Sequence, residues 1–298
     1  MPSNCYTGSC GLGCVLVVAY SVLTAFCNAL SAVLAAMGMM NSNPNAANLY
    51  MALSQVALLS VLLAVDMPAV SWGALLCFAV SGALANCVAR LLNFRSMRVI
   101  GVANTSAVVG SSPLISTVLA IVFLGEPMLL TVVAGAALVV VGVYLISGSE
   151  GLGRVGGGAL VAPVLSATFY AASNVFRKLG LNLQPHSVLA AQSSTLSGLV
   201  LFGGYILASG RTGDLAAPRR SLMYYVAAGL VGGVGWVAIM KAMNLGTVSV
   251  VGTIVFSYPL ISLALTWLLL RGQERITART VMGCMTVVAG VVLVTLLQ

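Results

Sequence analysis

Polar residues inside long apolar stretches are the side chains with the chemistry to bind a solute. Arg90 is the one arginine that we place inside such a stretch, and Asn86 lies one helical turn before it on the same face. Asn28 and Asn174 each lie near the middle of another stretch. A buried polar group is costly unless it has a partner. Two interpretations follow: these residues face a solute-binding cavity, or Arg90 extends to a polar boundary and the asparagines bond neighbouring helices.

Aromatic residues accompany the two asparagines. Tyr20 lies two turns before Asn28, and Tyr170 lies one turn before Asn174, on the same side of each helix. We expect both tyrosines to form walls of the same binding surface. Trp236 has the ring to stack on an aromatic or cationic solute, and a position in the aromatic belt of a membrane protein explains it equally well.

Two prolines lie near the middle of the fourth and ninth apolar stretches. Pro113 follows Ser112, and Pro259 follows Tyr258. Asn104 adds a further polar group to the helix that contains Pro113. A proline within a helix frees a backbone carbonyl one turn earlier. We predict that these two helices line a polar pathway; the structural alternative is that proline is common in membrane helices in general.

The composition determines which kind of fold must position these residues. Of the 298 residues, 60% are hydrophobic and only 6% are charged, against roughly 25% charged in ordinary soluble domains. The apolar stretches are long and unbroken, whereas a membrane barrel alternates apolar and polar residues. The sequence therefore predicts an all-α polytopic membrane protein, because a helix satisfies its own backbone in lipid.

At about 20 residues per crossing, the apolar stretches give ten transmembrane helices, which are separated by turn residues. The predicted spans are residues 12–37, 46–65, 69–92, 100–124, 128–147, 157–179, 187–209, 221–243, 246–270 and 277–297.

The two halves of the chain resemble each other. A shift of 146 residues places Asn28 on Asn174 and residues 113–116 on residues 259–262, with the identical sequence Pro-Leu-Ile-Ser. We infer a duplication. Five spans per copy is an odd number, so the second copy enters the membrane in the opposite sense. Two inverted five-helix repeats are typical of secondary transporters.

The repeat defines the domain organisation. Residues 1–147 form the first five-helix repeat, residues 158–298 form the second, and the glycine-rich residues 148–157 link them.

Several function classes lack the residues that they need. The net charge of +8 comes from basic residues near the ends of apolar stretches, which is typical of membrane topology signals rather than nucleic-acid binding. No predicted span contains Asp or Glu, and there is no metal-ligand cluster or phosphate-binding glycine loop followed by lysine. We expect no enzyme activity, no cofactor, no metal and no carboxylate proton relay.

A succession of short motifs is similar to a known family. Residues 94–97 (Phe-Arg-Ser-Met), Pro113 and residues 123–127 (Phe-Leu-Gly-Glu-Pro) precede a last helix with regularly spaced glycines. The succession recurs from residues 240–243 onward, although its second Leu-Gly-Glu turn is longer, at residues 270–274. The pattern resembles the EamA module of the drug/metabolite transporter superfamily. The resemblance implies a ten-helix basket around a central cavity that carries small metabolites, amino acids or drugs.

Charge placement and the resemblance disagree on orientation. Of the 13 basic residues, nine fall after odd-numbered spans, and three, Arg177, Lys178 and Lys241, after even-numbered ones. The bias places both termini outside, whereas many relatives are described with cytoplasmic termini. Both orientations stay open.

The sequence as a whole predicts a permease or exporter that moves a small organic metabolite by alternating access in the plasma (inner) membrane. The alternative is a non-transporting membrane protein with a structural or partner-regulating role on the same fold. We expect a small-molecule substrate and membrane lipid as partners, no nucleic acid, and a monomer or weak homodimer. The few charges within the spans favour a neutral, zwitterionic or apolar solute over a polyphosphorylated one.

Overall fold

The fold was analysed in a computed structural model. It describes residues 11–65, 67–68, 70–112, 115, 134–135, 137–138, 141–142, 145, 157–245, 251, 254–255, 258–270 and 277–296. Pro113, most of the predicted fifth span and residues 148–156 of the predicted linker lie outside these residues.

The described residues form helices and the connections between them, without a strand. The α-helices are α1 (Gly11–Met39), α2 (Pro44–Val65), α3 (Trp72–Gly82), α4 (Arg90–Ile100), α5 (Val102–Val109), α8 (Val161–Leu183), α9 (Ser187–Ala208), α10 (Arg219–Leu245), α12 (Tyr258–Leu269) and α13 (Ala278–Leu296). A π-helical segment, Ala83–Ala89, joins α3 to α4, and short 3₁₀ helices occupy Gly157–Leu160 and Thr212–Leu215.

Five helical segments within the described part are long and apolar enough to cross a membrane: Val15–Met39, Pro44–Val65, Trp72–Ile100, Gly158–Leu183 and Arg219–Leu245. The predicted all-helical membrane class is confirmed at this level. Their outward faces carry large apolar side chains, such as Val61 and Leu76, which are 67% and 68% exposed. Such faces suit contact with lipid tails rather than water.

The third predicted span ends later than its sequence indicated. We placed its end near residue 92 because Arg95 and Arg98 follow, but the helix continues to Ile100. Gly101, at a φ of 84°, ends it in a conformation that glycine adopts without strain. Arg90 therefore lies ten residues before the helix end rather than about three, within the bundle.

The described residues cover parts of both predicted proline helices. Helix α5 ends at Val109, followed by a turn at Gly110 and Ser111. Helix α12 contains Pro259, and Val251, Ile254 and Val255 before it are also helical.

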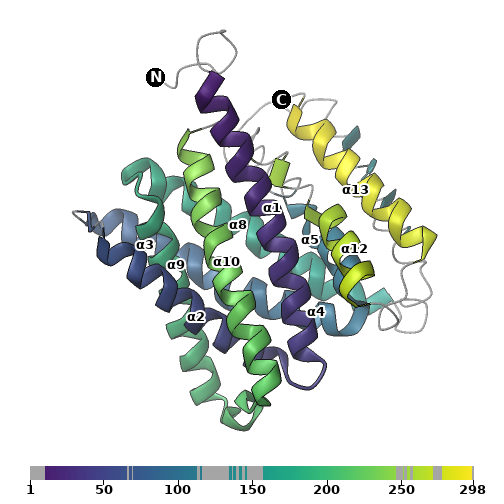
Figure 1. The fold of residues 1–298 in the computed structure, drawn as a ribbon, viewed down its shortest axis with the longest axis horizontal. Coiled ribbons are helices and arrows are strands. Elements are labelled where there is room, and N and C mark those ends of the chain that lie inside the picture. Colours follow the sequence, from purple (N-terminus) through teal and green to yellow (C-terminus); the bar gives the residue numbers. More distant parts are fainter. Residues whose placement is uncertain are drawn as a thin grey trace.

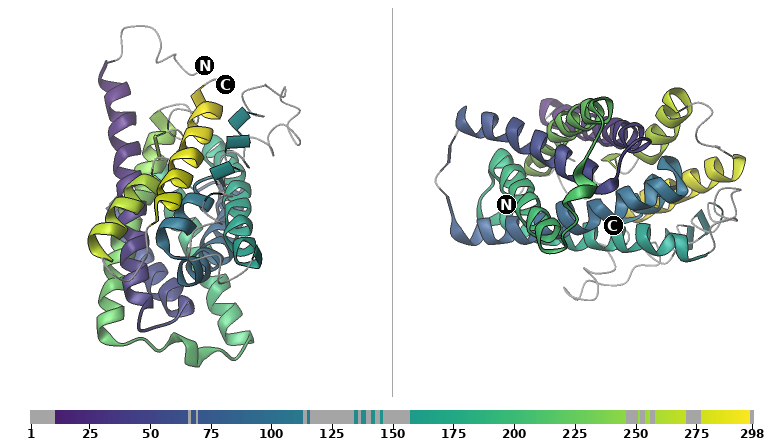
Figure 2. Two further views of the ribbon diagram at one scale, coloured as in Figure 1. Left: turned by 90° about the vertical axis from the view of Figure 1, so that its right-hand side faces the viewer. Right: turned by 90° about the horizontal axis from the view of Figure 1, so that it is seen from below.

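Helices from the two halves of the chain pack against each other in antiparallel pairs. Helix α1 lies beside α10 (Figure 1), and hydrogen bonds run from Ser31 to the Ala228 carbonyl at 2.8 Å and from Thr24 to the Gly235 carbonyl at 3.4 Å. The equivalent pairing, with the two halves exchanged, is that of α8 with α3, the π-helical segment and α4 (Figure 2).

Two further antiparallel pairs complete this pattern. Helix α2 packs on α9, with Gln192 donating to Ser60 at 2.7 Å, and α5 packs on α12, where the Ser106 and Ser262 hydroxyl oxygens lie 3.0 Å apart. The outer helix α13 packs beside α5 and α12 (Figure 1). Each of these four pairs joins one helix from each half of the chain.

Small residues allow these helices to approach closely, as is common in membranes. Gly198 of α9 faces the Asn86 side chain and the Gly82 carbonyl of the neighbouring helix, so closely that an added Cβ would lie 2.5 Å and 2.9 Å from their atoms. Gly82 in turn lies against the backbone of Ser194.

Replacing Gly198→Ala is expected to lower the thermal unfolding temperature of the detergent-purified protein, because overpacking of this kind costs about 1–3 kcal/mol. Gly203→Ala and Gly204→Ala are matched controls in the same helix, where an added Cβ meets nothing within 4 Å. These two should be neutral or stabilising, since alanine favours helix by about 1 kcal/mol over glycine. Equal stability of all three variants would contradict the close approach of α9 to the π-helical segment.

Candidate functional site

The π-helical segment and the start of α4 position Asn86 and Arg90. The Arg90 Nη2 donates to the Asn86 Oδ1 at 2.9 Å, and the Asn86 Nδ2 donates to the Ser194 carbonyl of α9 at 3.1 Å. Arg90 is only 9% exposed. The neighbouring helix thus fixes the asparagine, and the asparagine fixes the guanidinium inside the bundle rather than at a polar boundary. π-Helical turns are rare and are often found at functional sites.

A second arginine, Arg177 of α8, is also buried. It is 2% exposed, and its Nη1 donates to the Asn174 Oδ1 at 2.8 Å and its Nη2 to the Ser173 hydroxyl at 3.3 Å. Its guanidinium carbon lies 4.2 Å from the centre of the Trp236 ring of α10. We counted Arg177 among the basic residues that follow the sixth span, although the predicted span ran to residue 179; that count is wrong, because Arg177 is a buried residue of α8.

Tyr170 lies between the two arginines. Its hydroxyl lies within hydrogen-bonding reach of Arg90 and Asn93 and within electrostatic range of Arg177. The Tyr258 side chain of α12 lies near that of Tyr170.

Helices α4, α8 and α10 and the π-helical segment therefore bring six side chains together, which we call the arginine cluster. Its members are Asn86, Arg90, Tyr170, Asn174, Arg177 and Trp236.

Several donors of the arginine cluster are buried without a hydrogen-bond partner among the described residues: Nη1 of Arg90, Nε of Arg177 and Nε1 of Trp236. A charged side chain at the centre of a bilayer costs about 2.5–3.5 kcal/mol on insertion scales. Two buried charges whose N–H groups lack acceptors among the described residues identify this cluster as a candidate binding site rather than as internal packing.

Tyr258 and Asn104 belong to the neighbouring contact between α5 and α12. The Tyr258 hydroxyl donates to the Ser106 carbonyl at 2.9 Å, and the Asn104 side chain donates to the Ile100 carbonyl at 2.8 Å. Ser112 is buried, and Pro259 packs closely on Gly110. These residues connect two helices from different halves of the chain, next to the arginine cluster.

Tyr20 and Asn28 of α1 lie in other surroundings. Tyr20 is half-buried beneath the Lys241 ammonium, which lies 5.8 Å from its ring centre. Asn28 is half-buried and faces Gly235 of α10. Tyr20 and Trp236 pack against the same group of buried apolar residues, and Gly235 directly precedes Trp236. Helix α1 therefore lies beside the arginine cluster, without a hydrogen bond from Tyr20 or Asn28 to it among those given by the described residues.

Arg177 is the residue that sequence reasoning missed. The signal that could have identified it is its spacing from Asn174, three residues along a helix, which resembles the four-residue spacing of Asn86 and Arg90. In both pairs an asparagine on the same helix face accepts from the guanidinium.

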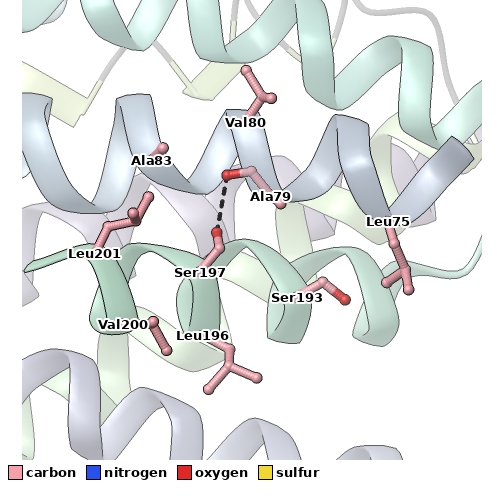
Figure 3. A pocket seen from close by; sticks show the side chains of 9 residues that line it. All are labelled: Leu75, Ala79, Val80, Ala83, Ser193, Leu196, Ser197, Val200 and Leu201. Carbon is pink, nitrogen blue, oxygen red and sulfur yellow. Dashed lines mark hydrogen bonds between the residues drawn. The ribbon is translucent and has the colours of Figure 1, made fainter. Parts of the chain in front are cut away.

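A groove of about 610 Å³ lies between α3 with its π-helical extension and α9 (Figure 3). Its lining is apolar apart from Ser193 and Ser197, and the Ser197 hydroxyl already donates to the Ala79 carbonyl at 3.0 Å. The exposed leucine and valine side chains around it suit lipid tails. It lacks the convergent polar groups that orient a solute.

Within the described part of the chain, no group of three or more His, Cys, Asp or Glu side chains lies close enough to hold a metal ion. Among those residues Cys27, Cys77, Cys87 and Cys284 are free thiols.

Comparison with known proteins places this fold. The sequence profile of the EamA-like transporter family matches the chain twice, over residues 15–148 and residues 157–296. A solved structure described only as "Crystal structure of protein" is 17% identical, covers 97% of this chain and 99% of its own, and has a TM-score of 0.65. At that identity the likeness shows the fold alone. No curated protein matches the chain.

The two family matches together cover nearly the whole sequence, and the described residues form long apolar helices. The predicted resemblance is confirmed: this chain is a membrane protein that belongs to the EamA-like transporter family.

Proposed function

We propose that the protein is a secondary transporter that moves a small organic solute across the plasma (inner) membrane by alternating access between two inverted five-helix repeats. The observation that carries the proposal is the antiparallel pairing of helices from the two halves. The pair of α1 with α10 has its counterpart in α8 with α3 and α4. The shift of 146 residues places α1 on α8, and α3 and α4 on α10, so the two pairs are equivalent with the repeats exchanged. Such an exchange is expected for a pseudo-twofold axis in the membrane plane.

The position of the arginine cluster supports the same function. It draws Arg90 from one repeat and Arg177 and Trp236 from the other, so relative movement of the repeats would change the geometry of the site. A transporter needs this coupling, because its binding site must be exposed to each side of the membrane in turn.

The alternative is a structural or partner-regulating protein whose cavity has closed. A closed cavity would be filled by apolar side chains at the centre of the bundle. The described residues instead place two arginines, two asparagines and a tyrosine together there. We therefore favour transport, with the protein acting as a monomer or weak homodimer.

Reconstitution into liposomes tests this function. The purified protein should give saturable flux of at least one member of a panel of amino acids, amines, sugars and organic acids, whereas protein-free liposomes should not. Absence of saturable flux for every member, in both directions, would contradict the proposal.

A further inference from the structure

The arginine cluster carries an excess of positive charge in the described structure. Arg90 and Arg177 are both more than nine-tenths buried, and the side chains that accept from them are all neutral: Asn86, Tyr170, Asn174 and Ser173. Asp214, the one acidic residue in the described part, instead accepts from Asn45 at 3.0 Å. The other four acids, Asp66, Glu126, Glu150 and Glu274, fall outside the predicted spans of the sequence.

Buried charges in proteins are normally paired, and here the partner is missing while donors remain. Nη1 of Arg90 and Nε of Arg177 have no acceptor among the described residues, and neither does Nε1 of Trp236. Guanidinium groups bind carboxylates and phosphates through pairs of parallel N–H donors. The Tyr170 hydroxyl, which interacts with both arginines, adds a further donor at the same place.

The geometry points to a small organic oxyanion as the transported solute, with its carboxylate or phosphate group bound by Arg90, Arg177 and Tyr170. This inference rests on the transport function proposed above and names its substrate class. It replaces the preference for a neutral, zwitterionic or apolar solute, which was based on the small number of charges within the predicted spans.

The repeat relation also orients the solute. The shift of 146 residues that aligns the two halves places Arg90 on Trp236 and Arg177 on Ser31. The buried positive charge therefore belongs to the pair of α4 with α8. At the equivalent positions α10 and α1 carry an aromatic ring and a hydroxyl, and Lys241 of α10 is exposed. An oxyanion with an apolar body fits this asymmetry, with its charged end towards α4 and α8 and its body towards Trp236.

The first test is thermal unfolding of the detergent-purified protein with matched probes at equal ionic strength. The probes are benzoate, succinate and glycerol 3-phosphate, against benzamide, succinamide and glycerol. A ligand that binds only the folded state raises its unfolding temperature. We expect at least one anion to raise it and the neutral counterparts to have no effect. The comparison of carboxylates with the phosphate ester identifies which oxyanion the site prefers.

The arginine variants locate the binding. Arg90→Gln and Arg177→Gln should each weaken the anion response about tenfold or more, since hydrogen bonds between charged groups are lost. Lys178→Gln, which removes an exposed charge next to Arg177, and Arg98→Gln, which removes an exposed charge on α4, should keep the response. If a glutamine variant fails to fold, Arg177→Lys retains the charge and should still weaken binding, because it loses the planar fork.

A second readout reports the site directly. In a Trp72→Phe/Trp267→Phe background the remaining tryptophan is Trp236, which stacks with Arg177. Its emission should change with the same anions, at the same concentrations. Equal stabilisation by neutral probes or amines, or an unchanged anion response in the glutamine variants, would overturn the inference. Saturable flux of a neutral or cationic solute alone would overturn the substrate class and leave transport intact, whereas anion binding without flux would overturn transport alone.

Discussion

Oxidation of a Ser106→Cys/Ser262→Cys variant should reduce solute flux to the level of protein-free liposomes, and a reductant should restore it. The two hydroxyl oxygens lie 3.0 Å apart, on α5 of the first half and α12 of the second. A disulfide needs Cβ atoms about 3.5–4.5 Å apart, which residues in direct hydroxyl contact can meet. A covalent bond between the repeats at this point would hold them in one arrangement.

The expected loss follows from the mechanism rather than from damage to the site. Neither serine belongs to the arginine cluster. The contact lies next to that cluster, where the Tyr258 hydroxyl donates to the Ser106 carbonyl. If α5 and α12 separate when the transporter opens on one side, the disulfide prevents that step. Alternating access requires one repeat to move against the other around the bound solute.

The controls use the remaining chemistry of the chain. The seven native cysteines are first replaced, so that the oxidant acts only on the introduced pair. Each single variant, Ser106→Cys or Ser262→Cys, should keep its flux under the same oxidant. Full flux through a cross-linked protein, with the disulfide verified by mass, would show that this contact stays closed throughout transport.

The helical class was predictable because it follows from composition. A chain with 6% charged residues needs lipid around it, and in lipid a helix is the structure that satisfies its own backbone. The boundaries were less predictable, since charged residues were taken as helix ends. Arg95 and Arg98 suggested an end near residue 92, yet the helix continues until Gly101 breaks it. A basic residue therefore does not by itself mark the end of a membrane helix.

Most of the arginine cluster was predictable from the sequence. Asn86, Arg90, Tyr170, Asn174 and Trp236 were all identified as polar or aromatic residues within apolar stretches. Arg177 was missed because it was counted, with Lys178, among the basic residues that follow the sixth span. The structure separates them, with Arg177 buried and Lys178 exposed on the same helix.

Other features of the site depend on contacts between distant segments. The Asn86 side chain donates to the carbonyl of Ser194, which lies 108 residues later in the chain. The Arg177 guanidinium lies over the ring of Trp236 on another helix. No local spacing specifies such partners. The pairing of Arg90 with Asn86 was different, because residues four apart on a helix are neighbours whatever the tertiary structure.

Asn174→Asp is expected to abolish anion recognition while raising thermal stability. The Asn174 Oδ1 already accepts from the Arg177 Nη1 at 2.8 Å, so a carboxylate of nearly the same shape would form an ion pair there without new geometry. The ion pair supplies the negative charge that we assign to the solute. The anion response and the flux should fall about tenfold or more, because a fixed partner competes with the transported one.

Asn174 is a more specific position than Asn86 for this substitution. The Asn86 Nδ2 donates to the Ser194 carbonyl, so an aspartate there would lose a hydrogen bond and bring two acceptor oxygens together. At position 174 the described structure records only the contact with Arg177 for the side chain. A loss of function at this position therefore has one physical cause, the neutralised guanidinium.

The control is Asn28→Asp, the equivalent position of the first repeat. Asn28 faces Gly235 rather than an arginine, so a carboxylate there is half-buried without a partner and should lower stability while leaving the preference for anions in place. Opposite shifts in unfolding temperature, with anion recognition lost only in Asn174→Asp, are the expected result. If Asn174→Asp gains stability and still transports and binds anions as the unmodified protein does, Arg177 serves only to hold α8 against α10, and the oxyanion is bound elsewhere.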